Sequence, residues 1–233
     1  MDNTDRPTTR AIIFDLDGTL ADTLDDIVNA VNYALDHVQH EPLDHAAVRR
    51  MVGDGLPALM SRAGETSDEA MVAFLVRRFQ EHYEENYLAN TRLFEGADRF
   101  LARCDQQGML LAILSNKPHT YTLLICDELL ERWSFGAIVG AHEGLPIKPH
   151  PAAALAMADA MKRDPAEMFF VGDSVVDIET ARATGMRSVA VTWGFQDRER
   201  LRSAGPDHLV DDFDELWEVI RERGMPPAAR AGP

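Results

Sequence analysis

Cysteine is scarce in this 233-residue sequence, which contains only Cys104 and Cys126. The two form no CxxC pair and no spacing typical of a metal site, so a disulfide framework is excluded and both are expected to be packing thiols. This cysteine usage favours a cytoplasmic protein. Long apolar runs are also missing, since the longest, Ala152–Ala158, is far shorter than the ~18 residues of a membrane-spanning helix. The first ten residues are polar and lack the apolar segment of a signal peptide.

Basic residues are outnumbered by acidic ones. The chain has 23 Lys and Arg against 39 Asp and Glu, which gives a formal net charge of −16. A field of this sign repels phosphate backbones and anionic lipids, so neither nucleic acid nor a membrane is an expected partner. A small anionic ligand is compatible with this charge if its site is locally positive. The 45% hydrophobic content and a length that fits one to two domains predict a chain that folds around its own core.

Short apolar runs that end abruptly in polar residues predict the strands of this core. Continuous rather than alternating apolar residues are typical of strands buried on both faces. Helical segments are predicted between the runs, and alternation of strand and helix indicates an α/β fold, a Rossmann-like parallel sheet with helices on both faces. The predicted strands are Ala11–Phe14, Met109–Leu114, Met168–Val171 and Ser188–Val191, with Ala137–Val139 as a weaker candidate and Asp207–Val210 as an edge strand, and the predicted helices are Ala97–Gln107, Ala152–Lys162 and Val175–Thr184.

The stretch between the first strand and residue 93 interrupts this alternation, because it contains no convincing strand. Apolar residues at helical spacing from Leu24 to Leu35 predict one helix. Thr66 with Glu69, read as a capping box, predicts the start of a second helix. The stretch is therefore expected to form an all-helical insertion.

This reading divides the chain into an α/β core of residues 1–21 and 93–224 and an inserted helical domain of residues 22–92. Loops at Ala21–Thr23 and Thr91–Gly96 are expected to be the hinges of the insertion. Residues 225–233, rich in Pro, Gly and Ala, are expected to be a frayed tail.

Asp15-Leu16-Asp17-Gly18-Thr19 directly follows the first predicted strand. In open parallel sheets, ligands bind outside the carboxyl ends of the strands, so Asp15 and Asp17 are expected to point into such a crevice. Gly18 would permit the sharp turn between them. A DxD pair alone also occurs in ordinary turns with solvated acids, so the assignment depends on the motifs that follow.

With these motifs in order, the chain resembles the haloacid dehalogenase-like hydrolases and, within them, the phosphoglycolate phosphatase branch. The resemblance runs from about Ala11 to Gly194. The helical insertion sits where the C1 cap of this family sits, so it is called the cap below. The motifs are Asp15-Leu16-Asp17-Gly18-Thr19, Ser115-Asn116 after a strand, Lys148 in Ile147-Lys148-Pro149-His150-Pro151, Gly172-Asp173-Ser174-Val175-Val176-Asp177, and the flanking segments Leu20-Ala21-Asp22-Thr23 and Val191-Thr192-Trp193-Gly194.

The resemblance implies covalent catalysis on a phosphate monoester. Asp15 would be the nucleophile that forms an aspartyl-phosphate. Asp17 would be the general acid for the leaving alkoxide and then the general base for the attacking water. Thr19 would orient Asp17, although a turn hydroxyl that serves only the backbone explains it equally well.

The resemblance also implies a magnesium site. Asp15 and Asp173 would be side-chain ligands and the carbonyl of Asp17 a third ligand, a hard oxygen set that suits Mg²⁺. Gathering Asp15, Asp17, Asp173 and Asp177 at one end of the sheet needs such a cation, because neighbouring carboxylates repel each other. Asp177 would be a water-mediated or supporting partner, unless it is simply an acid in the first turn of a helix.

The remaining motif residues are expected around the phosphoryl oxygens. Lys148 would neutralise their charge, and Ser115 with the backbone N–H of Asn116 would donate hydrogen bonds to one of them. Ser174 is a supporting residue of the same motif as Asp173. Lys148 could otherwise be a solvated lysine, but its position between two prolines after a strand favours the site.

Two departures narrow the activity within the family. Its dehalogenases lack a second aspartate in the first motif, and Asp17 is present here. Its phosphonatases need a Schiff-base lysine in the cap, and no lysine occurs between Asp22 and Arg92. Both activities are therefore disfavoured.

Substrate choice would depend on the cap. Gly53-Asp54-Gly55 lies in a glycine-bracketed loop that resembles the substrate loop of phosphoglycolate phosphatases and could equally be a plain turn between helices. Histidines next to motif residues are expected at helix starts rather than in catalysis; these are His119 and His150. Candidate cations for a substrate carboxylate, each also explicable as a solvated helix residue, are Arg49, Arg50, Arg62 and Lys117.

The sequence thus predicts a Mg²⁺-dependent phosphatase for a small phosphorylated metabolite, with 2-phosphoglycolate as the first expectation. The alternatives on the same scaffold are a pyrophosphatase, a sugar-phosphate phosphatase and a β-phosphoglucomutase-type phosphotransferase. A binding protein without turnover is disfavoured because every motif acid is intact, and a receiver domain is disfavoured by the insertion and Asp17. The protein is expected to be a monomer or a homodimer.

Overall fold

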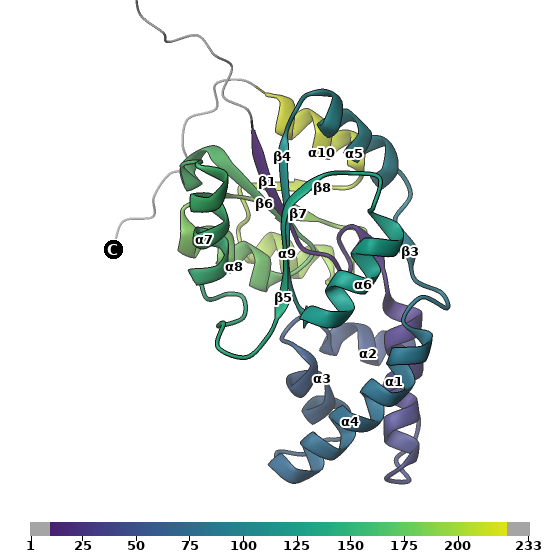
Figure 1. The fold of residues 1–233 in the computed structure, drawn as a ribbon. Helices are drawn as coiled ribbons and strands as arrows, with labels where there is room; N and C mark the ends of the chain where they lie inside the picture. The colour runs from purple at the N-terminus through teal and green to yellow at the C-terminus, as the bar shows by residue number, and fades with distance from the viewer. Residues whose placement is uncertain (1–9, 223–233) are drawn as a thin grey trace, which may run out of the picture.

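The computed structural model describes residues 10–222, and its centre is a six-stranded sheet (Figure 1). The strand order is β5-β4-β1-β6-β7-β8, and every neighbouring pair is parallel. Each predicted run forms a strand, including the weaker candidate and the edge strand, so the predicted fold class is confirmed. The strands are β1 (Ala11–Phe14), β4 (Leu110–Pro118), β5 (Phe135–Ala141), β6 (Met168–Gly172), β7 (Arg187–Val191) and β8 (His208–Val210).

Helices cover both faces of this sheet (Figure 1). Ile12 and Phe14 of β1 pack into the core on one face, whereas Ala11 and Ile13 pack into the core on the other. Because both faces are buried, β1 is apolar at every position. One face is covered by α5 (Ala97–Gln106), α6 (His119–Leu129) and α10 (Phe213–Arg221), and the other by α7 (Ala152–Met161), α8 (Val175–Thr184) and α9 (Arg198–Ser203), with a 3₁₀ turn at Pro165–Glu167 before β6.

The inserted helices form a second hydrophobic cluster next to the sheet (Figure 1). The predicted capping box of Thr66 and Glu69 is wrong, since Asp68 is the N-cap of the second predicted helix and accepts a hydrogen bond from the amide of Met71. Asp68 has the carboxylate side chain that suits an N-cap, and the Thr66 hydroxyl accepts from the Asp68 amide instead. The helices are α1 (Leu24–Asp36), α2 (His45–Met51), α3 (Leu56–Ala63) and α4 (Glu69–Asn86).

The two chain crossings between the cap and the core lie side by side as a small antiparallel ribbon. It consists of β2 (Ala21–Asp22) and β3 (Arg92–Leu93), with Asp22 paired to Arg92. The Asp26 carboxylate of α1 adds hydrogen bonds from Asn90 and Thr91 at 2.8–3.1 Å. The segments expected as loops are therefore tied together, in strands too short for a sequence pattern to reveal.

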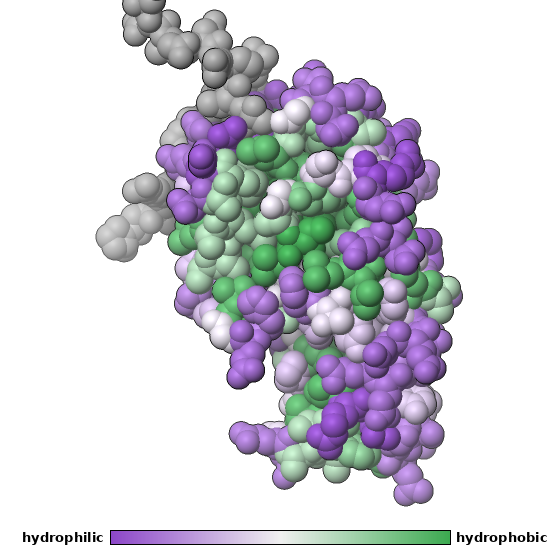
Figure 2. All heavy atoms as spheres, viewed as in Figure 1, coloured by the Kyte–Doolittle hydropathy of each residue, from purple (hydrophilic) through white to green (hydrophobic). Residues whose placement is uncertain are grey.

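The surface of the sheet region carries an apolar area. Strand β5 is an edge strand whose residues are mostly half-buried, and Figure 2 shows hydrophobic residues gathered over this part of the molecule. No helix within residues 10–222 is long and apolar enough to cross a membrane. The tail predicted at residues 225–233 lies outside the described residues.

Candidate active site

Asp15 lies at the carboxyl end of β1, the central position of the sheet. Its carboxylate accepts a hydrogen bond from the Leu16 amide at 2.7 Å and lies 2.9 Å from the Lys148 ammonium. Gly18 has φ +76°, a conformation that favours glycine, and a Cβ there would collide with the Asp173 carboxylate. Gly18 thus permits the sharp turn and also lets Asp173 approach.

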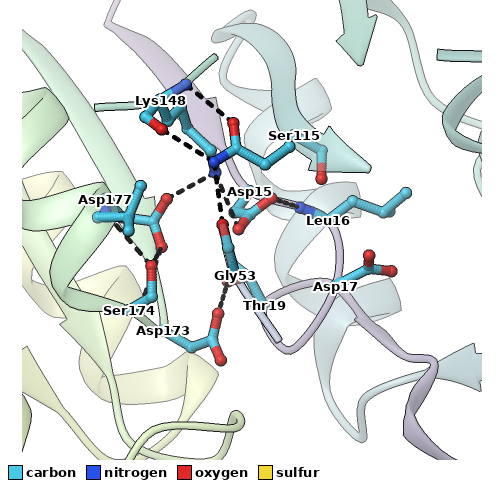
Figure 3. A network of polar contacts seen from close by, with 12 residues as sticks. Asp15, Leu16, Asp17, Thr19, Gly53, Ser115, Lys148, Asp173, Ser174 and Asp177 are labelled. Atoms are coloured by element: carbon cyan, nitrogen blue, oxygen red, sulfur yellow. Dashed lines mark hydrogen bonds and ion pairs between the residues drawn. The ribbon is translucent and has the colours of Figure 1, made fainter. Parts of the chain in front are cut away.

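Three carboxylates converge beside the sheet (Figure 3). Asp15, Asp173 and Asp177 each offer one oxygen, and these oxygens all lie within 4.8 Å of one another. Asp177 is fixed by the Ser174 hydroxyl at 2.5 Å in a capping box of α8, which is the supporting position expected for Ser174. Gly172 makes room for Asp177, because a Cβ at residue 172 would overlap its carboxylate.

Lys148 is the positive charge of this cluster. Its ammonium lies 2.6 Å from Asp177 and 2.9 Å from Asp15, and its side chain is 2% exposed. Burial alone would lower the pKa of Lys148, but the two carboxylates hold it above its ordinary value, so the ammonium stays charged. The structure therefore places Lys148 in the site rather than in solvent.

One ammonium does not balance three carboxylates. Burial raises the pKa of Asp15 to about 6 against the opposing effect of Lys148. Burial, with the nearby charges of Asp177 and Asp15, also raises the pKa of Asp173 well above its ordinary value. The excess of negative charge and the all-oxygen donor set fit a divalent magnesium ion held by Asp15 and Asp173, with Asp177 at the same cluster.

The side chain of Asp17 lies outside this group of three carboxylates, although Asp17 lines the same cavity as Asp15 and Asp173 (Figure 3). It pairs with the buried Lys117 ammonium at 3.1 Å and accepts a hydrogen bond from the Thr23 hydroxyl at 2.8 Å. The prediction that Thr19 orients Asp17 is wrong, since the Thr19 hydroxyl donates to Asp173 at 3.2 Å. The turn after β1 directs Asp17 toward β4 and the cap, so Thr23 takes the orienting position.

Strand β4 is longer than predicted and includes the second motif. The strand runs on to Pro118, so Ser115, Asn116 and Lys117 lie on it rather than after it. The Asn116 side chain accepts from the Lys148 amide at 2.8 Å and donates to the Lys148 carbonyl at 2.9 Å. It also donates to the Gly53 carbonyl of the cap loop at 2.9 Å, so one amide joins the Lys148 segment to the cap. The Ser115 hydroxyl is buried and accepts from the Lys117 amide at 3.3 Å.

A cavity of about 60 Å³ lies between the cap and the carboxylates. Gly53 and Gly55 of the predicted cap loop line it, whereas Asp54 does not and pairs with Arg62 instead. Of the predicted cations, Lys117 lines the cavity and the three arginines do not. Arg50 is exposed, and Arg49 donates to the carbonyls of residues 194 and 195.

Several residues of the site were not predicted. Thr23 was named only in a hinge and in a flanking segment of the resemblance, with no contact assigned to it, and Tyr83 was not singled out. Phe195 donates its amide to Asp173 at 2.6 Å, a backbone contact that no side-chain pattern reveals. The predicted helix-start position of His119 is confirmed, since α6 begins there, whereas His150 lies two residues before α7.

Known proteins resemble this chain in sequence and in fold. The sequence profile of the haloacid dehalogenase-like hydrolases matches residues 12–191, more than half of the chain. A phosphoglycolate phosphatase of Mesorhizobium japonicum is 33% identical over 216 residues, which covers 91% of this chain and 95% of that protein. One of Xanthomonas campestris pv. campestris is 35% identical over 211 residues, covering 90% and 95%. A solved structure from Haemophilus somnus, described as a predicted phosphoglycolate phosphatase, has a TM-score of 0.85 at 28% identity and covers 91% of this chain and 98% of its own.

The parallel sheet with acidic residues at its strand ends, taken with these relatives, defines a phosphatase. By sequence, the chain belongs to the haloacid dehalogenase-like hydrolase family. The resemblance inferred from the motifs is therefore confirmed.

Proposed function

We propose that the protein is a Mg²⁺-dependent phosphatase that hydrolyses 2-phosphoglycolate through an aspartyl-phosphate. The observation that carries this proposal is the position of Asp15, whose carboxylate lies at the end of β1 between the Lys148 ammonium and the acidic cluster. The choice of 2-phosphoglycolate is supported by the relatives, which are phosphoglycolate phosphatases.

In the first step, a carboxylate oxygen of Asp15 attacks phosphorus and the bond from phosphorus to the bridging oxygen breaks. The leaving alkoxide takes a proton from the Asp17 carboxyl group, so the alcohol departs neutral at that oxygen. Asp17 lies two residues after Asp15 and is held by Lys117 and Thr23, so its position is fixed before substrate binds.

In the second step, water attacks phosphorus of the aspartyl-phosphate and Asp17 takes a proton from that water. The bond to the Asp15 oxygen breaks, which restores the carboxylate and releases inorganic phosphate. An acyl phosphate suits this role because its carboxylate is a good leaving group.

Charge on the phosphoryl group is balanced by Lys148 and by the ion for which Asp15, Asp173 and the Asp17 carbonyl are the proposed ligands. When bound, Mg²⁺ would supply electrostatic stabilisation of the phosphoryl oxygens. Ser115 and the backbone N–H of Asn116 are the proposed hydrogen-bond donors to one of these oxygens.

Residues 22–92 are proposed to act as a cap that covers the aspartyl-phosphate and admits small substrates. The lining of the cavity by both the cap loop and the carboxylates supports this assignment. A small metabolite as substrate is consistent with a cytoplasmic location and with a monomer or homodimer as the working unit.

A substrate panel with released phosphate as readout tests the proposal. We expect the kcat/KM for 2-phosphoglycolate to exceed that for ethyl phosphate, pyrophosphate and hexose phosphates by at least about tenfold, a difference that one charged contact can supply. Equal rates on all esters would refute 2-phosphoglycolate as the preferred substrate. Preference for pyrophosphate or a sugar phosphate would select that alternative.

The Asp15→Asn variant tests the nucleophile. Asparagine keeps the shape of the side chain but cannot form the acyl phosphate, so turnover should be lost while the circular dichroism spectrum is unchanged. Rapid acid quenching with ³²P-labelled substrate should label the wild type and leave the variant unlabelled. Retained turnover in the variant would exclude Asp15 as the nucleophile.

A further inference from the structure

Tyr83 of helix α4 has a buried hydroxyl whose proton has no acceptor among residues 10–222, because the neighbouring Lys117 ammonium can only donate to it. The side chain is fully buried, and it lines the cavity between cap and core. A buried hydroxyl left unpaired costs free energy, so such groups are rare and need an explanation. Burial raises the pKa of Tyr83 to about 12, so near neutral pH the hydroxyl keeps its proton and can donate it to a ligand.

Lys117 provides a positive charge next to this hydroxyl. It is the single Lys or Arg among the described residues that line the cavity, and its ammonium lies 4.7 Å from the centroid of the Tyr83 ring. The ammonium contacts both oxygens of Asp17, at 3.1 and 3.2 Å. An ammonium has three N–H donors, so beside the Asp17 carboxylate it can serve one further acceptor, which is the Tyr83 oxygen in this structure and would be a ligand oxygen when one is bound.

The cap side of the cavity is otherwise apolar. It is formed by aliphatic and aromatic side chains, and the cap arginines make other contacts. An anionic group on the leaving alcohol would be desolvated against this wall unless it reached the hydroxyl and the ammonium. The apolar side chains are Ile27, Val52, Leu56, Leu59 and Phe79.

The chemistry of the leaving group gives the distance that must be spanned. Asp17 is proposed to protonate the bridging oxygen, and the Lys117 ammonium lies 3.1 Å from the Asp17 carboxylate. In the phosphate ester of a 2-hydroxy acid, the carboxylate carbon is two bonds from that same oxygen. A substrate placed for proton transfer from Asp17 therefore has its carboxylate within reach of Lys117, which lines the same cavity.

We propose that the Tyr83 hydroxyl and the Lys117 ammonium together bind the carboxylate of the leaving alcohol, which makes O-phosphorylated 2-hydroxy acids the substrate class. This inference rests on the proposed phosphatase function and adds the site that recognises the part of the substrate beyond phosphorus. The apolar wall accommodates a hydrogen or a short alkyl group at the second carbon.

The Tyr83→Phe variant tests this site because it removes the hydroxyl alone. Its matched control is Tyr121→Phe, since Tyr121 also lines the cavity but its hydroxyl donates to the Gln80 carbonyl at 3.4 Å. The two substrates are 2-phosphoglycolate and ethyl phosphate, which has a methyl group in place of the carboxylate. In Tyr83→Phe, kcat/KM for 2-phosphoglycolate should fall about tenfold to a hundredfold, the contribution of one hydrogen bond to a charged group. The value for ethyl phosphate should change less than twofold, and Tyr121→Phe should change neither.

Thermal unfolding of the same variants separates binding from structure. Because the hydroxyl proton has no acceptor among the described residues, Tyr83→Phe should have nearly the same Tm as the wild type. A Tm lower by several degrees would show that the hydroxyl has a structural partner and would overturn the inference.

The outcomes for the inference and for the proposed function differ. If the wild type prefers 2-phosphoglycolate and Tyr83→Phe retains that preference, the carboxylate site is wrong and the phosphatase function stands. If the wild type hydrolyses both esters equally, the carboxylate site is also wrong. If the wild type hydrolyses neither ester, the proposed function fails first and the inference falls with it.

Discussion

Asp15 is a carboxylic acid in a place where its ionised form is costly. Burial raises its pKa from 3.8 to about 6, with Lys148 acting against the shift and Asp177 adding to it. The proposed role of Asp15 as nucleophile needs the ionised form, so the site must receive positive charge when substrate binds. The proposed magnesium ion supplies that charge, which links metal binding to the protonation of the residue that reacts.

The pH dependence of stability in EDTA tests this balance. Between the unfolded pKa of 3.8 and the folded pKa of about 6, the folded state binds a proton that the unfolded state has released. The free energy of unfolding should therefore decrease as pH rises through this window and stay low above it. Asp15→Asn should show a smaller decrease in thermal unfolding scans between about pH 4 and about pH 8.

The control for this prediction is Asp36→Asn, which changes an exposed acid at the end of α1 and should keep the wild-type pH profile. Identical profiles for the wild type and Asp15→Asn would contradict the prediction. Added Mg²⁺ should raise the Tm of the wild type more at the alkaline end of the range than at the acid end, because the ion and the proton compete for the carboxylates.

The positions of some site residues could be predicted from the sequence, but the orientations of their side chains could not. Asp15 was predicted from the strand end that it follows, and Lys148 and Asp173 were predicted from the family motifs that they match. The orientation of Asp17 was not, since it depends on Lys117, a residue 100 positions away whose side chain meets it only after folding. Spacing along the chain identifies which residues reach the site, but the direction of a side chain on a tight turn is set by its neighbours in space.

At the scale of elements, helix α2 of the cap is attached to the core through Arg49. Its guanidinium donates to the carbonyls of Gly194 and Phe195 at 2.6 and 2.7 Å, and the amide of Phe195 donates to Asp173. The loop after β7 therefore contacts the cap with its carbonyls and the acidic cluster with an N–H. Cap position and the orientation of Asp173 are coupled through this loop.

Arg49→Met should weaken that coupling, because it removes two hydrogen bonds from a charged donor. We expect the KM for 2-phosphoglycolate to rise at least about tenfold and the Mg²⁺ concentration for half-maximal activity to rise with it. Arg50→Met, on the same helix but exposed, is the control and should leave both values unchanged. Equal kinetics for the two variants would show that the attachment plays no part in the reaction.

The ribbon at the base of the cap has its own buried anchor in Asp26. This carboxylate is 1% exposed and accepts hydrogen bonds from the backbone and side chains of Asn90 and Thr91. Asp26→Ala should lower the free energy of unfolding by about 3 kcal/mol, since charge-assisted donors lose their acceptor. Urea denaturation measures this value, with Asp25→Ala as the exposed neighbouring control. A change below about 1 kcal/mol in Asp26→Ala would contradict the anchoring role.

Long, strongly patterned elements were predicted closely, and short or polar ones were not. Helix α8 matches its predicted range, whereas α2, α9 and β2 are too short for a periodic pattern to emerge. Strand β4 continues past its apolar run because Ser115, Asn116 and Lys117 find buried partners. Polar residues end a strand in a sequence pattern, but they extend it when the site itself satisfies them.

On the scale of the whole molecule, the net charge of −16 opposes the approach of an anionic ester. Raising ionic strength from about 10 mM to about 150 mM shortens the Debye length from ~30 Å to ~8 Å and screens this repulsion. We therefore expect kcat/KM to increase with salt over this range. The increase should be steeper for 2-phosphoglycolate than for ethyl phosphate, because the carboxylate adds a charge. A decrease with salt for both esters would show that attraction within the site outweighs the repulsion of the whole surface.

The ribbon of β2 and β3 affects how the inserted domain can change during evolution. Because Ala21 pairs with Leu93, the point where the polypeptide leaves the sheet domain is adjacent to the point where it returns. An insertion with neighbouring ends can be lengthened, shortened or exchanged without moving any strand that carries a reacting group. If the insertion selects the substrate as proposed, that selection can change during evolution while the proposed reacting residues of the sheet domain stay fixed.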